Sequence, residues 1–326
     1  MPELPEVETV KRGLSVLLVG HIVKDISFDW PKSFPNAATD VKEFLIGAEI
    51  VAVRRRAKVL LIDLSSSYTL VIHLKMTGQL VYVKNPNSKS QVTNNNQTSK
   101  TQDPKRLGFS ARDLVLSEPA ARFGAGHPTD SLVGELPDRS TRVMFELDKG
   151  AVLFFNDQRK FGWVKLYPTI EVPNIDFMKK VGPEPLDDDF RCSMFESRLQ
   201  KRKNSMIKAV LLDQTVIAGV GNIYADESLW GAKIHPATKV ADIPKYKIKN
   251  LYTELLAVLR LAIEKGGSTD KNYVNAEGKR GSYIDFARVF RKEGTPCQRH
   301  PNSLIEKIKV ASRGTHICPT CQIIGS

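Results

Sequence analysis

The sequence contains no long hydrophobic run. Nothing in it approaches the ~18 consecutive apolar residues of a membrane-spanning helix. Residues 1–10 are acidic and lack the basic region and apolar core of a signal peptide. We therefore expect a protein that has no membrane partner and stays in the cytoplasm. Its 326 residues are enough for two domains that each bury a core.

Cysteine is also scarce, with four residues, three of them in the last thirty positions. This distribution excludes a disulfide framework. Two pairs of ligand-type residues, 297/300 and 318/321, instead have the spacing of zinc knuckles, and residues 304–310 between them alternate like a half-buried strand. A β-hairpin that joins two knuckles is a zinc ribbon.

The predicted zinc site is closed. It has four protein ligands and leaves no position for water or substrate, so we expect one structural Zn²⁺ and no catalytic metal. His316 competes with His300 for the fourth place. The predicted ligands are Cys297, His300, Cys318 and Cys321.

Acidic residues are fewer than basic residues in the second part of the chain. The formal net charge is +12, of which residues 1–190 carry +1 and residues 191–326 carry +11. A basic half of this kind suits a polyanion such as nucleic acid. An anionic membrane surface, or solubility alone, would also account for it.

The chain start places Pro2 directly behind Met1. If Met1 is removed, Pro2 presents a secondary amine that titrates near pH ~7.7–8.0, whereas a lysine titrates near ~10.4. Such an amine can attack a carbon such as a sugar C1′ and hold it as an iminium. The alternative is purely structural: Pro5 lies in the first turn of a helix, and the glutamates interact with its positive end.

Hydrophobic periodicity divides the chain into two regions. An apolar face at three- and four-residue steps predicts a helix over residues 7–17. A series of short β-branched or aromatic segments then predicts a sandwich or barrel, interrupted by a polar segment from about 83 to 140. The predicted strands lie within 22–30, 48–56, 58–64, 68–76, 141–148, 151–157 and 163–168.

Helical periodicity begins at about residue 185. Helices are predicted within 188–200, 205–213, 221–230 and 245–267. The glycine-rich segment 216–222 joins the second and third of these, with Asn222 at a helix N-terminus. Its glycines permit close approach to a phosphate or, equally, close packing of helices.

Ten motifs along the chain resemble formamidopyrimidine-DNA glycosylases, in family order from the first residue to the last. The resemblance to the endonuclease VIII branch is weaker, because that branch usually begins PEGPE and this chain reads PELPE. The motifs are PELPEVETV, RRRAKVLLIDL, HLKMTGQL, FNDQRKFG, GPEPL, VGNIYADESLW, IHPA, YVNAEGKRGSY, TPC and RGTHICPTCQ.

The resemblance implies an α+β fold of two domains. An N-terminal helix and an antiparallel β-sandwich would precede a helix-two-turn-helix domain with a zinc ribbon hairpin. The implied divisions are a catalytic domain over 1–172 with a partly flexible insertion at about 84–140, a linker over 173–184, a DNA-binding region over 185–267, a lesion-covering loop and connection over 268–290, and the ribbon over 291–326.

The implied activity is that of a bifunctional DNA glycosylase and AP lyase without an organic cofactor. A monomer would remove oxidised purines, such as 8-oxoguanine and formamidopyrimidines, from damaged double-stranded DNA and cut the strand by β,δ-elimination. By resemblance, Pro2 attacks C1′, Glu3 is the acid and Lys58 binds phosphate near the lesion. Glu6 either orients the amine or is only a first-turn helix residue, and the arginines at 54–56 offer a second phosphate contact.

The remaining implied roles concern DNA binding. Met76 and Phe161 would fill the gap left by the everted base, and Arg159 would pair with the opposite cytosine. Asn222 and Arg313 would hold flanking phosphates, with Lys208 and Tyr224 as further DNA contacts. The loop departs from the family pattern at Gln158 and Lys160, where a proline and an arginine are usual.

Two further segments have predicted roles, and two alternative functions remain open. Residues 266–283 match the loop that covers an everted 8-oxoguanine. The insertion is predicted to join two strands, and its basic residues suggest an accessory DNA or protein contact: Lys84, Lys89, Lys100, Lys105 and Arg106. The alternatives are an endonuclease VIII-like glycosylase for oxidised pyrimidines and a non-catalytic zinc-containing DNA-binding protein, which would not need Pro2 and Glu3.

Overall fold

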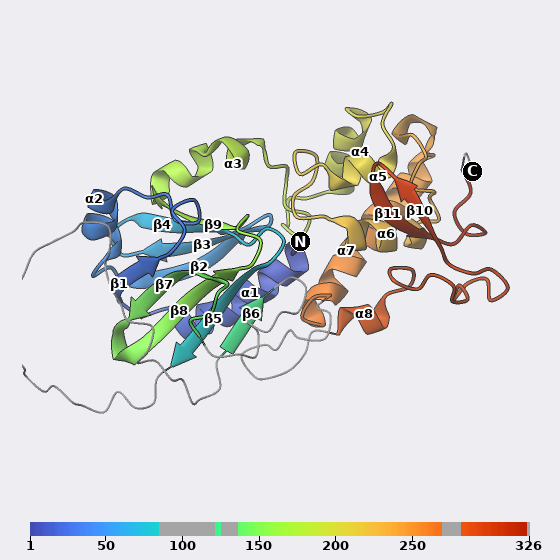
Figure 1. The fold of residues 1–326 in the computed structure, drawn as a ribbon. Helices are drawn as coiled ribbons and strands as arrows, with labels where there is room; N and C mark the ends of the chain where they lie inside the picture. The colour runs from blue at the N-terminus through green and yellow to red at the C-terminus, as the bar shows by residue number, and fades with distance from the viewer. Residues whose placement is uncertain (85–120, 125–135, 269–281, 325–326) are drawn as a thin grey trace, which may run out of the picture.

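The computed structural model of the chain describes residues 1–84, 121–124, 136–268 and 282–324. A half built of strands and a half built mainly of helices lie side by side, and the chain start lies at their junction (Figure 1). This arrangement confirms the predicted two-domain α+β fold.

The N-terminal half contains two antiparallel sheets. One has the strand order β1-β7-β8-β5-β6 and the other β2-β3-β4-β9. Seven of these nine strands were predicted; β5 was missed because its apolar residues run into the polar insertion, and the short β6 was missed because it lies within that insertion. The strands are β1 (Val23–Phe28), β2 (Ile50–Arg56), β3 (Val59–Leu64), β4 (Tyr68–His73), β5 (Gly78–Lys84), β6 (Ala121–Gly124), β7 (Thr141–Leu147), β8 (Ala151–Asp157) and β9 (Trp163–Pro168).

The predicted N-terminal helix forms as α1 (Leu4–Leu18) and packs on β2. Its apolar stripe, which includes Val7, Val10 and Leu14, is fully buried and joins the core between the two sheets. Burial of that stripe fixes the rotation of the helix about its axis. The beginning of α1 therefore points at the helical half, and the chain start contacts that half.

Shorter elements surround the sandwich. They are α2 (Ala38–Asp40), η1 (Val41–Leu45), η3 (Asp148–Gly150), η4 (Thr169–Asn174) and α3 (Asp176–Lys180). The last two cover one face of the four-stranded sheet, so the predicted linker 173–184 contains a helix. The insertion joins β5 to β7 as predicted, and β6 from within it pairs with β5. Four of its basic residues lie outside the described part, namely Lys89, Lys100, Lys105 and Arg106.

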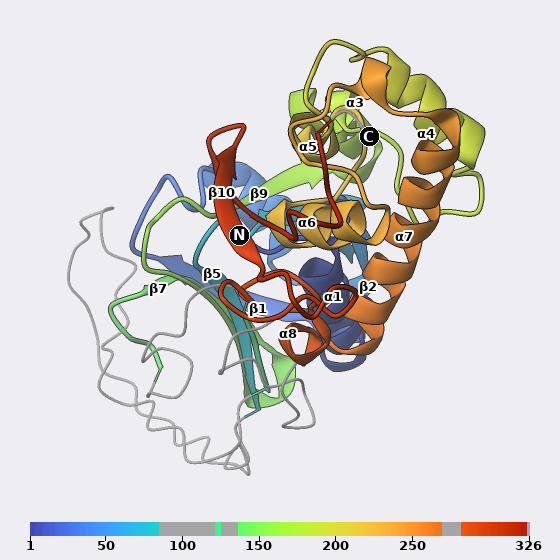
Figure 2. The same cartoon turned by 90° about the vertical axis from the view of Figure 1, so that its right-hand side faces the viewer.

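The four predicted C-terminal helices are all present, as α4 (Cys192–Gln200), α5 (Ile207–Leu212), α6 (Asn222–Gly231) and α7 (Lys245–Glu264). Helix α6 packs against α7. Residues 224–230 of α6 are buried on all sides of the helix, so α6 lies at the centre of this half. The other elements are η5 (Val240–Asp242), α8 (Tyr283–Phe286) and the predicted hairpin, β10 (Glu306–Val310) and β11 (Arg313–Ile317). Figure 2 shows the hairpin beside α6.

None of the helices in the described ranges has both the length and the apolar character that crossing a bilayer requires.

Candidate active site

The chain start is docked on the N-terminus of α6. The carboxylate of Glu3 accepts hydrogen bonds from the backbone N–H groups of Ile223 (3.0 Å) and Tyr224 (3.5 Å). Two glycines make this approach possible. A Cβ at Gly221 would lie 2.3 Å from Glu3 Cδ, and a Cβ at Gly219, whose φ is +80°, would lie 2.6 Å from Leu4 Cβ. The glycine-rich joint therefore accommodates the chain start rather than only the packing of helices.

Burial changes the acidity of Glu3, which is 4% exposed. Desolvation raises its pKa to about 7, with a further rise from Glu6, against the lowering effects of Lys58 and the α6 backbone N–H groups. A carboxyl group with a pKa near neutrality keeps a substantial protonated fraction at pH 7. It is thereby suited to donate a proton.

The terminal amine lies in the same environment. Burial lowers the pKa of the Met1 amine from 8.0; Glu3 and Glu6 act against this change, and the positive charges of Lys58 and Arg313 add to it. These electrostatic neighbours place the amine among the predicted catalytic residues. After removal of Met1, the amine of Pro2, itself buried, would occupy this environment.

Lys58 links the two halves. Its Nζ donates a hydrogen bond of 2.8 Å to the carbonyl oxygen of Val220, in the joint between α5 and α6. Desolvation lowers its pKa, whereas Glu3 and Glu6 raise it. The structure thus brings all three predicted catalytic residues, Pro2, Glu3 and Lys58, together.

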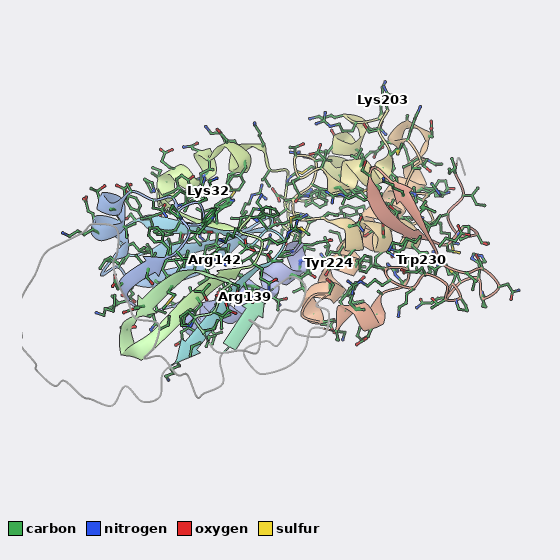
Figure 3. All side chains as sticks on the ribbon, viewed as in Figure 1. Lys32, Arg139, Arg142, Lys203, Tyr224 and Trp230 are labelled. Carbon is green, nitrogen blue, oxygen red and sulfur yellow. The ribbon has the colours of Figure 1, made fainter. Side chains whose placement is uncertain are left out.

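Glu6 is more than a first-turn residue. Its carboxylate accepts hydrogen bonds from the backbone N–H of Glu3 (2.8 Å) and from both the N–H (2.7 Å) and Oγ (2.8 Å) of Ser268. It also accepts one from the Tyr224 hydroxyl. Tyr224 is fully buried at the junction of the two halves (Figure 3). The structure therefore does not support the predicted contact of Tyr224 with DNA, because this side chain is inside the protein.

Lys208 requires the same correction. Its side chain is fully buried, with Nζ 2.6 Å from Asp226 Oδ1 and 2.6 Å from Thr315 Oγ1. The other oxygen of Asp226 accepts a 3.0 Å hydrogen bond from the backbone N–H of His316. Lys208 and Asp226 therefore fasten the hairpin to α5 and α6, and the lysine has no free ammonium to offer a phosphate.

Asn222 and Arg313 lie on one surface. Asn222 Nδ2 donates to the carbonyl oxygen of Gly314 at 3.0 Å, and Arg313 begins β11 beside it as an exposed residue. The two-residue turn before Arg313 has positive φ at both Ala311 and Ser312, as tight hairpins require. The tip of the hairpin thereby presents a cation that acts electrostatically on both the terminal amine and Lys58.

The predicted wedge residues are exposed at one end of the sandwich. Met76 is 38% and Phe161 53% exposed, and the guanidinium of Arg159 lies 4.8 Å from the centre of the Phe161 ring. Their two loops are joined by the fully buried Asp157. Its carboxylate accepts hydrogen bonds from the Thr77 hydroxyl and from the N–H groups of Arg159 (3.2 Å) and Gly162 (2.6 Å).

The arginines at 54–56 are already paired, so their predicted role as a second phosphate contact is not supported. Arg54 forms an ion pair with Asp63. Arg55 and Arg56 both bind Glu184, at 2.7 and 2.9 Å. These contacts hold the turn that carries Lys58 against the helical half.

A cavity of about 610 Å³ adjoins the chain start, lined by residues of both halves. His73 is the notable residue in its wall. Burial, with Lys75 and Lys58 nearby, lowers the pKa of His73 to about 3, so it is neutral at pH 7. Its Nδ1 accepts a 3.0 Å hydrogen bond from the Lys75 N–H, which leaves the proton on Nε2. The lining includes Met1, Lys58, His73, Lys75, Trp163 and Gln214.

The four predicted zinc ligands converge. One ligand atom from each lies within 4.8 Å of the others, which fits a single tetrahedral ion. His300 Nδ1 is 3.0 Å from Cys321 Sγ, whereas His316 points to Asp226 and Glu293. The structure therefore groups His300, rather than His316, with the three cysteines. The cluster packs against Trp230 of α6, which anchors the hairpin (Figure 3).

Comparison with known proteins agrees with this geometry. Family models match the formamidopyrimidine-DNA glycosylase N-terminal domain over residues 1–164, the H2TH domain of the same enzymes over 181–273, and the zinc finger found in FPG and IleRS over 303–323. The chain belongs to the formamidopyrimidine-DNA glycosylase family.

Relatives and solved structures extend along the whole chain. The formamidopyrimidine-DNA glycosylase of Latilactobacillus sakei is 37% identical over 99% of this chain and 98% of its own, and that of Pediococcus pentosaceus 39% over 99% and 100%. The Lactococcus lactis Fpg bound to DNA containing an abasic site has a TM-score of 0.77 at 31% identity, covering 98% of this chain and 99% of its own. A variant of that protein bound to Fapy-dG-containing DNA has a TM-score of 0.78 at 31% identity, covering 99% and 100%.

Several site residues escaped the sequence interpretation. Asp157, Glu184, Asp226 and His73 are all buried or nearly so and fix the positions of other side chains. The signal was present for Asp157, because a carboxylate ends the strand 151–157, whose first five residues are apolar. Nothing in the local pattern distinguishes the other three from ordinary polar residues.

Proposed function

We propose that the protein is a base-excision DNA glycosylase and AP lyase that removes oxidised purines by means of the Pro2 amine. Family membership makes it a DNA glycosylase. The observation that carries the detailed mechanism is the meeting of the terminal amine, Glu3 and Lys58 at the N-terminus of α6.

The first step is attack by the neutral Pro2 nitrogen on C1′ of the damaged nucleotide. The C1′–N bond to the base breaks, and the base leaves with the bonding electrons and takes up the proton that the attacking nitrogen loses. Glu3 donates a proton to the sugar ring oxygen as the C1′–O4′ bond opens, and the nitrogen lone pair then forms the iminium. A depressed amine pKa and a raised carboxyl pKa favour the protonation states that this step needs.

Strand cleavage follows from the iminium. Loss of a C2′ proton allows the 3′ phosphate to leave, and a second elimination releases the 5′ phosphate. Water finally returns the free amine. Glu3 is the carboxylate next to the sugar and serves these later proton transfers.

DNA contacts are proposed for Lys58, which lines the cavity at the chain start, and for residues that reach the surface. Lys58, Asn222 and Arg313 would hold the phosphates around the everted nucleotide, since phosphate contacts position a protein on DNA. Met76 and Phe161 would fill the gap in the stack, and Arg159 would read the opposite cytosine. The zinc ion, held by three cysteines and His300, would fix the hairpin that carries Arg313.

The name shared by the relatives, formamidopyrimidine-DNA glycosylase, favours oxidised purines over the pyrimidines of an endonuclease VIII-like enzyme. The raised pKa of Glu3 favours an enzyme over a non-catalytic DNA-binding protein, because binding alone gains nothing from a buried carboxyl group at the chain start. The predicted lesion-covering loop lies mostly outside the described residues.

The proposal also includes the finer predictions from sequence. The enzyme acts as a cytoplasmic monomer, where its DNA substrate is, and its divisions fall at 1–172, 173–184, 185–267, 268–290 and 291–326. The family matches over 1–164 and 181–273, with the break between strands and helices in the same region, support these divisions.

Borohydride trapping on a duplex with 8-oxoguanine opposite cytosine tests the mechanism. Protein with a free Pro2 should form a covalent adduct that peptide mass spectrometry assigns to Pro2. The matched control is the same chain with a residual N-terminal tag, which should bind the duplex but form no adduct. An adduct of equal yield with the tag in place, or one assigned to another residue, would defeat the proposal.

A further inference from the structure

The loop that carries Met76 and the loop that carries Arg159 and Phe161 are together called the wedge here. An arginine that takes no part in the proposed chemistry supports them. Arg142 lies near the start of β7 and is 4% exposed. Its Nε donates a 2.9 Å hydrogen bond to the carbonyl oxygen of Asp157, at the beginning of the loop that carries Arg159 and Phe161. Its two terminal nitrogens donate to the carboxylate of Asp29 and to the carbonyl oxygen of Arg139.

The three acceptors belong to three separate segments at one end of the sandwich. They come from the loop after β1, the loop before β7 and the end of β8. Figure 3 labels Arg139 and Arg142 in this part of the molecule. A guanidinium is planar and donates in several fixed directions, so one side chain can hold three acceptors that a lysine ammonium cannot hold in the same geometry.

From Asp157 the contacts continue to both wedge segments. Its carboxylate binds the Thr77 hydroxyl beside Met76, and it binds the N–H groups of Arg159 (3.2 Å) and Gly162 (2.6 Å) around Phe161. Asp157 therefore connects Arg142 by hydrogen bonds to Arg159 itself and to the residues next to Met76 and Phe161.

The loop after β1 supports the wedge from a second side. The Nζ of Lys160, between Arg159 and Phe161, lies 4.4 Å from the centre of the Trp30 ring. This loop is itself tied to β9, because Val164 N–H donates to the carbonyl oxygen of Ser33 at 2.7 Å. Asp29, which Arg142 binds, lies next to Trp30 in the same loop.

We propose that Arg142, with Asp29 as its charged partner, is a positioning residue that holds the wedge ready to enter the DNA. The inference rests on the proposed function. Eversion of a base costs a few kcal/mol of lost stacking and pairing. A wedge that is already ordered does not add its own loss of conformational freedom to that cost.

This role separates two activities of the same enzyme. Excision of 8-oxoguanine requires eversion of a stacked, paired base, whereas cleavage at a preformed abasic site has no base to evert. Loosening of the wedge should therefore slow excision much more than abasic-site cleavage. The ratio of the two rates in one preparation does not depend on the fraction of folded protein.

The test compares Arg142→Lys and Asp29→Asn with the wild-type enzyme in single-turnover assays on both substrates. We expect Arg142→Lys to lower the ratio of excision to abasic-site cleavage by about tenfold or more, as small misplacements of catalytic groups often do. Asp29→Asn removes the negative charge from one of the three acceptors and keeps the other two unchanged, so it should lower the ratio less. Arg142→Lys should also weaken the preference for cytosine over adenine opposite the lesion, because Arg159 is then less well placed.

Arg12→Lys, at an exposed ion pair on α1, is the matched control and should leave the ratio unchanged. If Arg142→Lys does not fold, Asp29→Asn decides the question, since the Asp29 side chain is 54% exposed and tolerates change. Equal losses on both substrates, or an unchanged ratio, would overturn the inference. A wild-type enzyme that is inactive on both substrates would instead overturn the proposed function.

Discussion

A single carboxyl group illustrates how the fold creates reactivity at the scale of the residue. Glu3 would be an ordinary acid in a free peptide, but the joint between α5 and α6 removes it from water and raises its pKa to about 7. Glu6 contributes through its negative charge. The same charge acts on the terminal amine and raises its pKa, against the larger lowering effect of burial.

Glu6→Gln should move the whole pH profile of base excision toward lower pH. Loss of the negative charge lowers the pKa of the amine, so the neutral nucleophile persists to lower pH. It also lowers the pKa of Glu3 from about 7, so the acid is lost earlier as the pH rises. We expect both the acidic and the basic limb of the pH profile to shift by roughly half a pH unit.

Single-turnover rates measured from pH 5 to 9 check this prediction. Glu8→Gln, on the same helix but paired with arginines and Lys11 away from the amine, serves as the control and should leave both limbs in place. Opposite shifts of the two limbs in Glu6→Gln would contradict the assignment.

At the scale of the element, the hairpin β10–β11 depends on its metal site and on α6. Its strands are short, and a two-stranded hairpin alone is only marginally stable in water. The zinc ligands and the packing on Trp230 hold the open end of the hairpin, and Lys208 and Asp226 bind β11. Arg313 stands next to the turn at the opposite end.

Removal of zinc, by chelation or by Cys321→Ser, should weaken DNA binding and leave the sandwich folded. Without the metal the hairpin no longer holds Arg313 in place, so a phosphate contact is lost. The slope of log K against log salt concentration should fall by about 1 for that contact.

Fluorescence anisotropy at several salt concentrations measures this slope, and far-UV circular dichroism reports the fold. Cys192→Ser is the matched control, because Cys192 lies outside the ligand cluster and its loss should preserve one zinc per chain. An unchanged slope in zinc-free protein would show that the hairpin does not need the metal to contact DNA.

For the whole molecule, polar contacts between the two halves assemble the site. Leu4 N–H binds the carbonyl oxygen of Gly219 at 2.9 Å, Lys58 binds that of Val220, and Arg55 and Arg56 bind Glu184. Glu184 is 6% exposed and also accepts a hydrogen bond from the backbone N–H of Ala57, next to Lys58. The two halves are therefore held at the catalytic residues themselves.

Glu184→Ala should destabilise the protein by about 3 kcal/mol, because it leaves the largely buried Arg55 with only part of its pairing. We also expect the two halves to unfold at different temperatures, since their main ion pairs are lost. Differential scanning calorimetry measures both effects. Glu171→Ala, at an exposed position on η4, should change little; comparable losses in the two variants would show that Glu184 does not couple the halves.

The local sequence pattern predicted most helices and strands. It failed where the surroundings of a residue in the folded protein determine its role. Short β-branched and aromatic segments indicated seven strands, and helical periodicity indicated α1 and the four helices α4 to α7. The pattern missed β5 and β6, which border and lie within the polar insertion. The family resemblance placed Lys208 and Tyr224 on the DNA, because residue type alone does not tell a buried ammonium or phenol from an exposed one.

The sequence by itself determined the two-part fold, the zinc ligand spacing and the identity of the residues at the chain start. These depend on the order of residues, which periodicity and spacing express directly. Only the tertiary structure decided that Glu3 is buried against α6 with a raised pKa, that the arginines at 54–56 are used for ion pairs, and that Arg142 supports the wedge. Such properties arise from groups far apart in the chain, whose desolvation and pairing exist only once the two halves have folded together.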